Sequence, residues 1–234
     1  PAPATGVLQL VNEEALLEAA VAHHCVIRME HRIGDFVVRG TTLVSVSCEG
    51  ELPSSLHTAV IEAHILNRTR TVEQDAAFGI RQIVDIALRA LSPSMNDTTT
   101  AVLCINYLTD LLHHLAARHP ESCFRLHEGR LRVVAPRPEF EEHLGLSFAQ
   151  ILANARDNGV LLERILWSIE TIAGAAQTPT RRTALAALVD DVQDKLARQF
   201  EGNTRARLQR RATELLQRLN RSATAPDASP ASAG

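Results

Sequence analysis

The strongest constraint on the fold of this chain is the stretch 78–91, which is apolar on nearly every side when drawn as a helix. A helix of that kind belongs in the interior of a protein. The stretch ends at Ser92, because the residue before a proline, here Pro93, avoids the helical conformation. We therefore expect a central, buried helix around which the rest of the chain is arranged.

Three charged side chains share one face of this predicted helix. Arg81, Asp85 and Arg89 are four residues apart, so they stack along the helix. The face either lies in water or forms an internal network in which Asp85 pairs with Arg81, Arg89 or both. If the network is internal, Asp85→Ala should lower stability more than Arg81→Ala, because it strands two cations.

Polar residues on either side of the helix complete a candidate binding cluster. Its members are Arg68, Asp75, Arg81, Asp85, Arg89, Ser92, Asn96 and Asp97. Carboxylate and amide oxygens of this kind could hold a cation such as Mg²⁺. Helix capping and turn formation explain Asn96 and Asp97 with fewer assumptions, and we favour them. We assign no catalytic residue and no metal ligand.

The first part of the chain predicts a small β-rich subdomain at residues 7–53. Strands are expected over 7–11, 25–30, 33–37 and 42–46, with a helix over 12–23 between the first two. Glycines at the corners indicate one curled sheet of at least three strands, similar in shape to a barrel-sandwich module. A biotinyl or lipoyl carrier role is excluded, because no lysine lies near this sheet.

The rest of the chain predicts a helical domain over residues 54–220, interrupted by a β-hairpin at 123–134. The helices beyond the hairpin are expected over 139–145, 147–157, 159–176, 180–200 and 204–220. Trp167 should be buried beside Leu166 and Ile169. Residues 221–234 should be a disordered tail. The predicted fold class is α+β and mostly helical: a small N-terminal sheet followed by a helical bundle with an inserted hairpin.

Charge and cysteine content exclude several function classes. The net charge is −3, which does not favour nucleic acid as a partner. The arginines of the last helix are expected to face acids such as Asp190, Asp191 and Asp194; they are Arg205, Arg207, Arg210, Arg211, Arg218 and Arg221. The 4 cysteines form no CxxC pair, so neither a zinc site nor a disulfide framework is predicted.

Several motif segments together resemble a known family. They are Gly34–Val37, Gly40, Leu43, Arg68-Thr69, Gln74-Asp75, Phe78–Gln82, Asp85–Pro93, Asn96-Asp97 and Thr100-Ala101. They are similar to the signature of predicted bacterial membrane proteins known as domain of unknown function 2254, over about Val7 to Asn220. The resemblance implies a membrane region upstream and no established activity. Thr98 departs from the signature, which has proline after Asn-Asp.

The resemblance, and a start at Pro1 without methionine, lead us to expect the soluble extramembrane module of a bacterial inner-membrane protein. We expect a non-catalytic role in binding, sensing or assembly, a homo-oligomer, no cofactor, and a position on the cytoplasmic side, since free cysteines favour that compartment. A small-molecule or ion ligand is left open. The alternative is an enzyme that uses Asp75, Asp85 and Asp97 for acid–base or metal-assisted chemistry, which would require a concave site.

Overall fold

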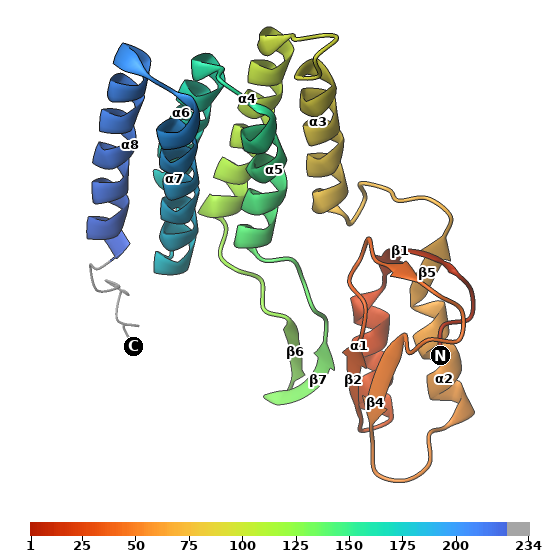
Figure 1. Cartoon of the computed structure of the whole chain (residues 1–234). Helices are drawn as coiled ribbons and strands as arrows, with labels where there is room; N and C mark the ends of the chain where they lie inside the picture. The colour runs from red at the N-terminus through yellow and green to blue at the C-terminus, as the bar shows by residue number, and fades with distance from the viewer. Residues whose placement is uncertain (224–234) are drawn as a thin grey trace. The chain divides into compact units, whose positions relative to one another are not determined.

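A computed structural model describes residues 1–223 of the chain (Figure 1). Contacts within it divide the chain into two units. The first holds Pro1–Gly79 and Pro120–Glu139, and the second holds Ile80–His119 and the residues from Phe140 onward. Helices predominate and two small sheets accompany them, so the predicted α+β, mostly helical class is confirmed.

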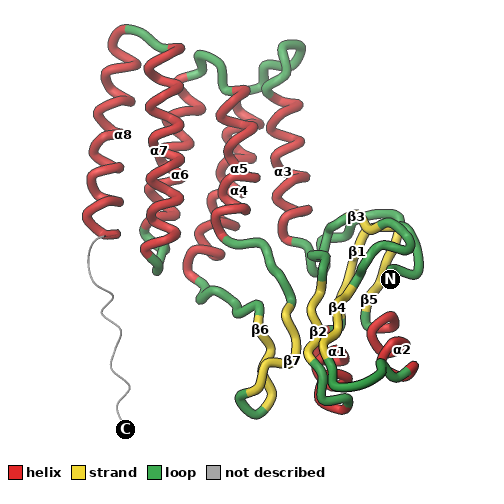
Figure 2. The backbone as a smooth tube through the Cα atoms, turned by 60° about the horizontal axis from the view of Figure 1, so that its bottom comes forward, coloured by secondary structure: helices red, strands yellow, loops and turns green. Residues whose placement is uncertain are grey.

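The first unit contains both sheets and two short helices. Its elements are β1 (Gly6–Val11), α1 (Glu13–Ala22), β2 (Val26–Met29), β3 (Phe36–Val37), β4 (Val44–Ser47), α2 (Ser54–Glu62), β5 (His64–Asn67), β6 (Phe124–His127) and β7 (Arg130–Val134). The strands predicted before residue 47 form, although the one expected over 33–37 is reduced to Phe36–Val37. They divide between two sheets, ordered β3-β1-β5 and β4-β2-β7-β6, so the single sheet expected from them is wrong (Figure 2).

Strands from later in the chain complete each sheet. β5 pairs antiparallel with β1, with Val7 opposite Asn67. β7 pairs parallel with β2, with Ile27 opposite Val133. Neither sheet closes into a barrel over the described residues. The first unit has one apolar core, which contains Leu8 of β1. α2, β5 and the hairpin also contribute apolar side chains to this core.

The hairpin is fastened to the first unit by charge as well as by apolar contact. Glu13 accepts hydrogen bonds from Nε of Arg125 at 2.9 Å and from Nη2 of Arg137 at 2.6 Å. Arg137 also pairs with Glu121 at 2.7 Å. The first turn of α1 is thereby tied to residues more than a hundred positions later in the chain, a contact that no local sequence pattern predicts.

The second unit is a stack of helices, in which each helix runs antiparallel to the next one in the chain (Figure 1). Its elements are α3 (Ala76–Ala90), which begins in the first unit, α4 (Thr98–Ala117), α5 (Phe140–Asn154), α6 (Gly159–Ala173), α7 (Pro179–Gln199) and α8 (Gly202–Ala223). α4 packs on α6 and α6 on α8, while α5 packs on α7. The prediction that residues 139–220 are almost wholly helical is confirmed. The helices expected over 139–145 and 147–157 form one continuous helix, α5, and Gly145 lies within it.

The central helix of this unit is α6 and not the stretch 78–91. Leu162, Ile165 and Ile169 of α6 are fully buried. α3 stands at one end of the row in Figure 1 and buries only one face, while Ile86 on its other side is 50 % exposed. The expectation of a central helix here is wrong, because Gln82, Asp85 and Arg89 give α3 an outer face that suits water.

Two expectations about side chains of the second unit are also corrected. Trp167 is 37 % exposed, with the guanidinium of Arg164 at 4.5 Å from its ring, whereas its neighbours Leu166 and Ile169 are buried. α6 buries one face, and Trp167 lies just outside that face. Of the tail predicted for residues 221–234, the first three belong to α8 and the others lie outside the described residues.

Three arginines of α8 pair with acids of α6 and not with the acids expected on α7. Arg207 forms two hydrogen bonds with Glu163, at 2.6 and 2.9 Å. Arg211 and Arg218 reach Glu170 at 3.2 and 2.8 Å. Asp194 instead pairs with Arg198 in its own helix. The hydrogen bonds from Arg207, together with the charges of Arg207 and Arg211, hold the pKa of Glu163 below its usual value.

One buried cation closes the end of α4. Arg181, in the first turn of α7, is 6 % exposed and donates to the carbonyls of Ala116 and Arg118 at 3.0 and 2.6 Å. Its guanidinium also lies 5.6 Å from the ring centre of Phe140. Carbonyls at the C-terminus of a helix lack partners within the helix and carry partial negative charge, so a cation there is stabilising.

Replacing Arg181 with alanine should lower the free energy of unfolding by about 2–4 kcal/mol, because buried carbonyls lose their donor. The measurement is urea unfolding followed by circular dichroism. Arg198→Ala is the control and should change stability by less than about 0.5 kcal/mol, since that exposed side chain pairs within its own helix. Similar small losses for both variants would contradict the capping role of Arg181.

Candidate functional site

Asp75 is the most enclosed of the predicted site residues. It directly precedes α3 and is 4 % exposed. One carboxylate oxygen accepts the backbone N–H of Phe78 at 2.9 Å and so caps the helix. The other oxygen accepts from Nε and Nη2 of Arg70 at 2.8 and 2.7 Å. The carboxylate is therefore committed to a helix cap and an ion pair, which is a structural arrangement.

Arg70 was not among the predicted residues. Its guanidinium stacks 5.2 Å from the ring centre of Phe78, which adds a cation–π contact to the ion pair. Arg68, which was predicted, has an exposed side chain. A basic residue five positions before a helix-capping acid, in a segment too polar to be a strand, is the sequence signal that could have identified Arg70.

The loop that follows β2 lies directly against this ion pair. Gly34 has a φ of 92°, and a Cβ at this position would lie 2.5 Å from Oδ2 of Asp75 and 2.6 Å from Nη2 of Arg70. Its N–H donates to the carbonyl of Leu8 in β1 at 2.8 Å. The motif glycine is thus needed both for its backbone conformation and for the space that the ion pair occupies.

Gln74 ties the same segment to the first sheet. Its Oε1 accepts the N–H of Val11 at 3.0 Å, and its Nε2 donates to the carbonyl of Val11 at 3.4 Å. Together with Gly34, Arg70, Asp75 and Phe78 it forms a set of contacts that we call the motif joint. The motif joint fixes the connection from β5 to the first turn of α3.

The charged stripe of α3 is a partly solvated face. Nε of Arg81 lies 2.9 Å from Oδ1 of Asp85, so the predicted pairing with Arg81 is confirmed. Both side chains are substantially exposed, at 36 % and 46 %, and Arg89 is exposed as well. The prediction of an internal network is therefore wrong. An exposed ion pair contributes little to stability, so Asp85→Ala is no longer expected to lower the free energy of unfolding by much.

The turn between α3 and α4 follows the capping interpretation. Asp97 accepts the N–H of Thr100 at 3.0 Å and also its hydroxyl, and these hydrogen bonds lower the pKa of Asp97. Asn96 has a φ of 46°, a conformation that asparagine tolerates well. The carbonyl of Ser92 accepts from the N–H groups of Met95 and Asn96 at 3.1 and 2.9 Å.

Thr98 has its own role at the position where the family signature has proline. Its hydroxyl accepts a hydrogen bond from Nδ2 of Asn158 at 2.7 Å, and the side chain of Asn158 caps α6. The start of α4 is thereby joined to the start of α6. A proline would supply rigidity but no oxygen for this contact.

The eight predicted residues do not share one set of contacts. The structure brings Arg81 and Asp85 together, places Asp75 in the motif joint, and uses Ser92, Asn96 and Asp97 in a turn. Over residues 1–223, no group of three or more histidine, cysteine, aspartate or glutamate side chains is placed to hold a metal ion. The cysteines are free thiols.

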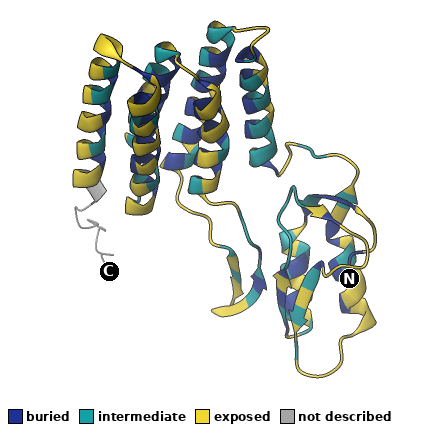
Figure 3. Ribbon diagram, in the orientation of Figure 1, coloured by how far each residue is buried: buried dark blue, intermediate teal, exposed yellow. Residues whose placement is uncertain are grey.

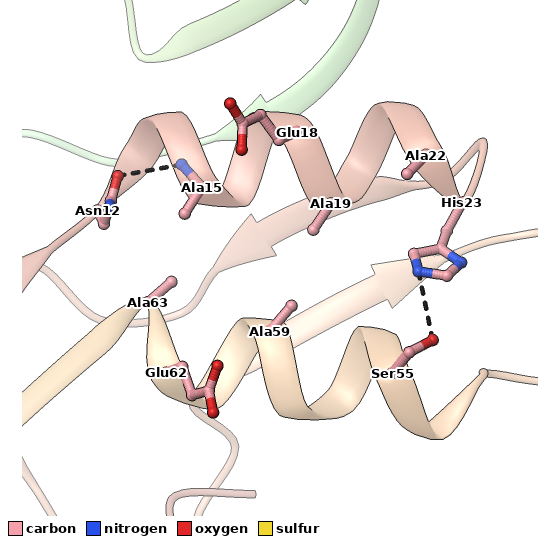
Figure 4. Close-up of a pocket in the computed structure, with 10 residues that line it drawn as sticks. All are labelled: Asn12, Ala15, Glu18, Ala19, Ala22, His23, Ser55, Ala59, Glu62 and Ala63. Carbon is pink, nitrogen blue, oxygen red and sulfur yellow. Dashed lines mark hydrogen bonds between the residues drawn. The ribbon is translucent and has the colours of Figure 1, made fainter.

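A groove of about 560 Å³ lies between α1 and α2 (Figure 4). Its floor is made of small side chains: Ala15, Ala19, Ala22, Ala59 and Ala63. Glu18 and Glu62 also line it, and His23 and Ser55 approach each other to 3.5 Å. Two acids beside an apolar floor favour neutral or cationic groups over anions. None of the predicted cluster residues lines this groove.

The fold and these contacts define a two-unit α+β protein, with one β-rich unit that contains the motif joint and one unit that is a stack of helices. The chain belongs to the family described as "Predicted membrane protein (DUF2254)", whose pattern matches residues 1–171. No helix of residues 1–223 is both long enough and apolar enough to span a bilayer.

The curated relatives include uncharacterised proteins of Mycobacterium bovis and Mycobacterium tuberculosis. Each is 31 % identical to this chain over 226 residues, which is 93 % of the chain and 43 % of the relative. The chain thus spans less than half the length of these relatives. No solved structure gives a significant match.

Gly34→Ala should destabilise the protein more than Gly40→Ala. Both glycines have positive φ, at 92° and 87°, so both variants incur the backbone strain of about 1–2 kcal/mol. A Cβ at Gly40 meets nothing within 4 Å, whereas one at Gly34 collides with the Arg70–Asp75 pair. We expect an additional loss of about 1–3 kcal/mol for Gly34→Ala in urea unfolding. Equal losses would show that the pair does not restrict this loop.

Asp75 should contribute far more to stability than Asp85, the reverse of what the charged stripe suggested. Asp75→Ala should cost about 3–5 kcal/mol, because it removes a helix cap and leaves Arg70 without its buried partner. Asp75→Asn should cost less, since asparagine can still cap the helix. Asp85→Ala is the matched control, with a loss of less than about 0.5 kcal/mol. Comparable losses for Asp75→Ala and Asp85→Ala would refute the motif joint as the stabilising element.

Proposed function

We propose that this chain is the extramembrane module of a bacterial inner-membrane protein and that it serves there as a non-catalytic assembly module. The observation that carries the proposal is the charge on the outer faces of its helices. Exposed charged residues run along α7 and α8, and the same two helices show exposed bands in Figure 3. Such faces belong in water, because charged side chains are costly in hydrocarbon.

Membership of a family of predicted membrane proteins supports the membrane part of the proposal. The length of the mycobacterial relatives adds to this, since more than half of each relative lies outside the matched region. In the proposed arrangement that additional sequence supplies the membrane anchor, and the residues of this chain stand in the aqueous phase.

A non-catalytic role is supported by the way the motif residues are used. Asp75 caps α3 and pairs with Arg70, and Asp97 caps α4, so two of the three acids of the enzyme hypothesis serve as helix caps. The third, Asp85, pairs with Arg81 on a partly solvated helix face. The groove between α1 and α2 contains none of these three acids.

The proposed partner is protein and not nucleic acid. Arg207, Arg211 and Arg218 of the basic helix already pair with Glu163 and Glu170. The net charge of −3 gives no general attraction for phosphate backbones. We further propose the cytoplasmic side of the membrane, because the free cysteines suit a reducing compartment.

Cell fractionation tests the proposal. The longer protein should remain in the membrane pellet after a carbonate wash, whereas the 234-residue chain expressed alone should be recovered in the supernatant. For the side of the membrane, a membrane-impermeant maleimide should label the partly exposed Cys48 and Cys123 only after cells are permeabilised. Carbonate-resistant attachment of the short chain would contradict the extramembrane placement, and labelling in intact cells would contradict the cytoplasmic one.

A further inference from the structure

One helix of the second unit carries large apolar side chains on its exposed face. Leu103, Tyr107 and Leu111 of α4 are 50 %, 59 % and 41 % exposed. They are four residues apart, so they form one continuous stripe along the helix. We call these three residues the α4 stripe. A stripe of three large apolar side chains along one exposed helix face marks a candidate interaction surface.

The α4 stripe points away from the helix on which α4 packs. Thr109 contacts Ser168 of α6, and Thr98 bonds to Asn158 at the start of α6. Tyr107 is two residues from Thr109 and therefore about 200° round the helix from it. Within the second unit α4 packs on α6 and on α5, and the three residues of the α4 stripe remain exposed outside both contacts.

We propose that a second copy of this chain docks on the α4 stripe, with the two α4 helices antiparallel about a two-fold axis at Tyr107. The stripe is symmetric in sequence, with one leucine four residues before Tyr107 and one four residues after it. The two-fold axis therefore places Leu103 of each copy against Leu111 of the other, and Tyr107 against Tyr107. A symmetric dimer requires this kind of self-complementary surface.

Charges at the two ends of α4 select the antiparallel arrangement. Asp97 lies at the N-cap and the exposed Arg118 at the C-cap, about 30 Å apart along a helix of this length. Antiparallel pairing brings Arg118 of each copy to Asp97 of the other. Parallel pairing would bring the two acids together at one end and the two arginines together at the other.

This inference rests on the assembly role proposed above and gives it a specific partner. The two can fail separately. Dimerisation is measured with the 234-residue chain in solution, whereas membrane placement is measured by fractionation of the longer protein. If the chain dimerises through the α4 stripe but the longer protein is never found at a membrane, the dimer is supported and only the membrane placement is contradicted.

Single cysteines test the geometry directly. In a background of Cys48→Ser and Cys123→Ser, which leaves the buried Cys25 and Cys104, Tyr107→Cys should form a disulfide-linked dimer under mild oxidation. Leu103→Cys alone and Leu111→Cys alone should not, because the like positions would lie about 12 Å apart along the axis, beyond disulfide reach. A mixture of the Leu103→Cys variant and the Leu111→Cys variant should form a disulfide-linked dimer. Both of these variants keep Tyr107, so this cross-link tests the interface with its central side chain present.

Sedimentation equilibrium tests the energetics. Tyr107→Arg should raise the dimer dissociation constant at least about tenfold, since a buried tyrosine at an interface centre is replaced by a charge. Val160→Arg on α6, which changes a valine that is also 59 % exposed, is the control and should change the constant by less than about twofold. Arg118→Asp should weaken association most at low salt.

Three results would overturn the proposal. The first is a chain that stays monomeric at about 100 μM, a concentration that would populate any dimer of micromolar affinity. The second is cross-linking of Leu103→Cys and Leu111→Cys each with itself, which indicates parallel helices. The third is an equal effect of Tyr107→Arg and Val160→Arg on association, with folding shown to be intact by circular dichroism.

Discussion

The ion pair between Arg70 and Asp75 is the interaction on which the first unit depends most. The carboxylate of Asp75 is almost fully buried, and its two oxygens are divided between the guanidinium and the first turn of α3. A buried charge is tolerable only when its hydrogen bonds are complete, so the segment before α3 must adopt one conformation. Gly34 and Gln74 then fit around that conformation, from the loop after β2 and from the segment itself. Much of the family motif is thereby accounted for as mutually dependent packing.

Local patterns in the sequence predict the elements well but not their partners. The Asp97 cap, the hairpin and the helices after Pro138 follow from capping residues, turn residues and periodicity, which act over a few positions. The pairing of β1 with β5 and of β2 with β7 depends on strands far apart in sequence, and a strand's own residues do not specify its neighbour. The candidate cluster was predicted only in part: Asp75 was identified from its motif, whereas the close fit of Gly34 against the Arg70–Asp75 pair involves a loop about forty positions earlier and has no local signal.

The helical unit shows that the distribution of polar residues around a helix matters for whether it is central. α3 looked apolar on nearly every side, yet its polar residues all fall on one side and give it a water-facing surface. α6 contains Glu163, Arg164 and Glu170, and it is nevertheless central, because those residues leave its buried faces free to contact α4, α7 and α8. The decisive quantity is the number of faces a helix must bury. That number depends on the arrangement of neighbours, which the sequence of a single helix does not contain.

The hairpin between α4 and α5 has a consequence for synthesis of the chain on the ribosome. Val133 and Ala135 belong to the core of the first unit, and Arg125 and Arg137 neutralise Glu13 there. The N-terminal unit therefore cannot finish folding when its first 79 residues emerge; it must wait until α3 and α4 of the other unit have also been made. During that interval the edge of β2 that later receives β7 is open. An open strand edge is a site for mispairing, so the order of translation leaves this protein exposed to aggregation at one defined stage of its synthesis.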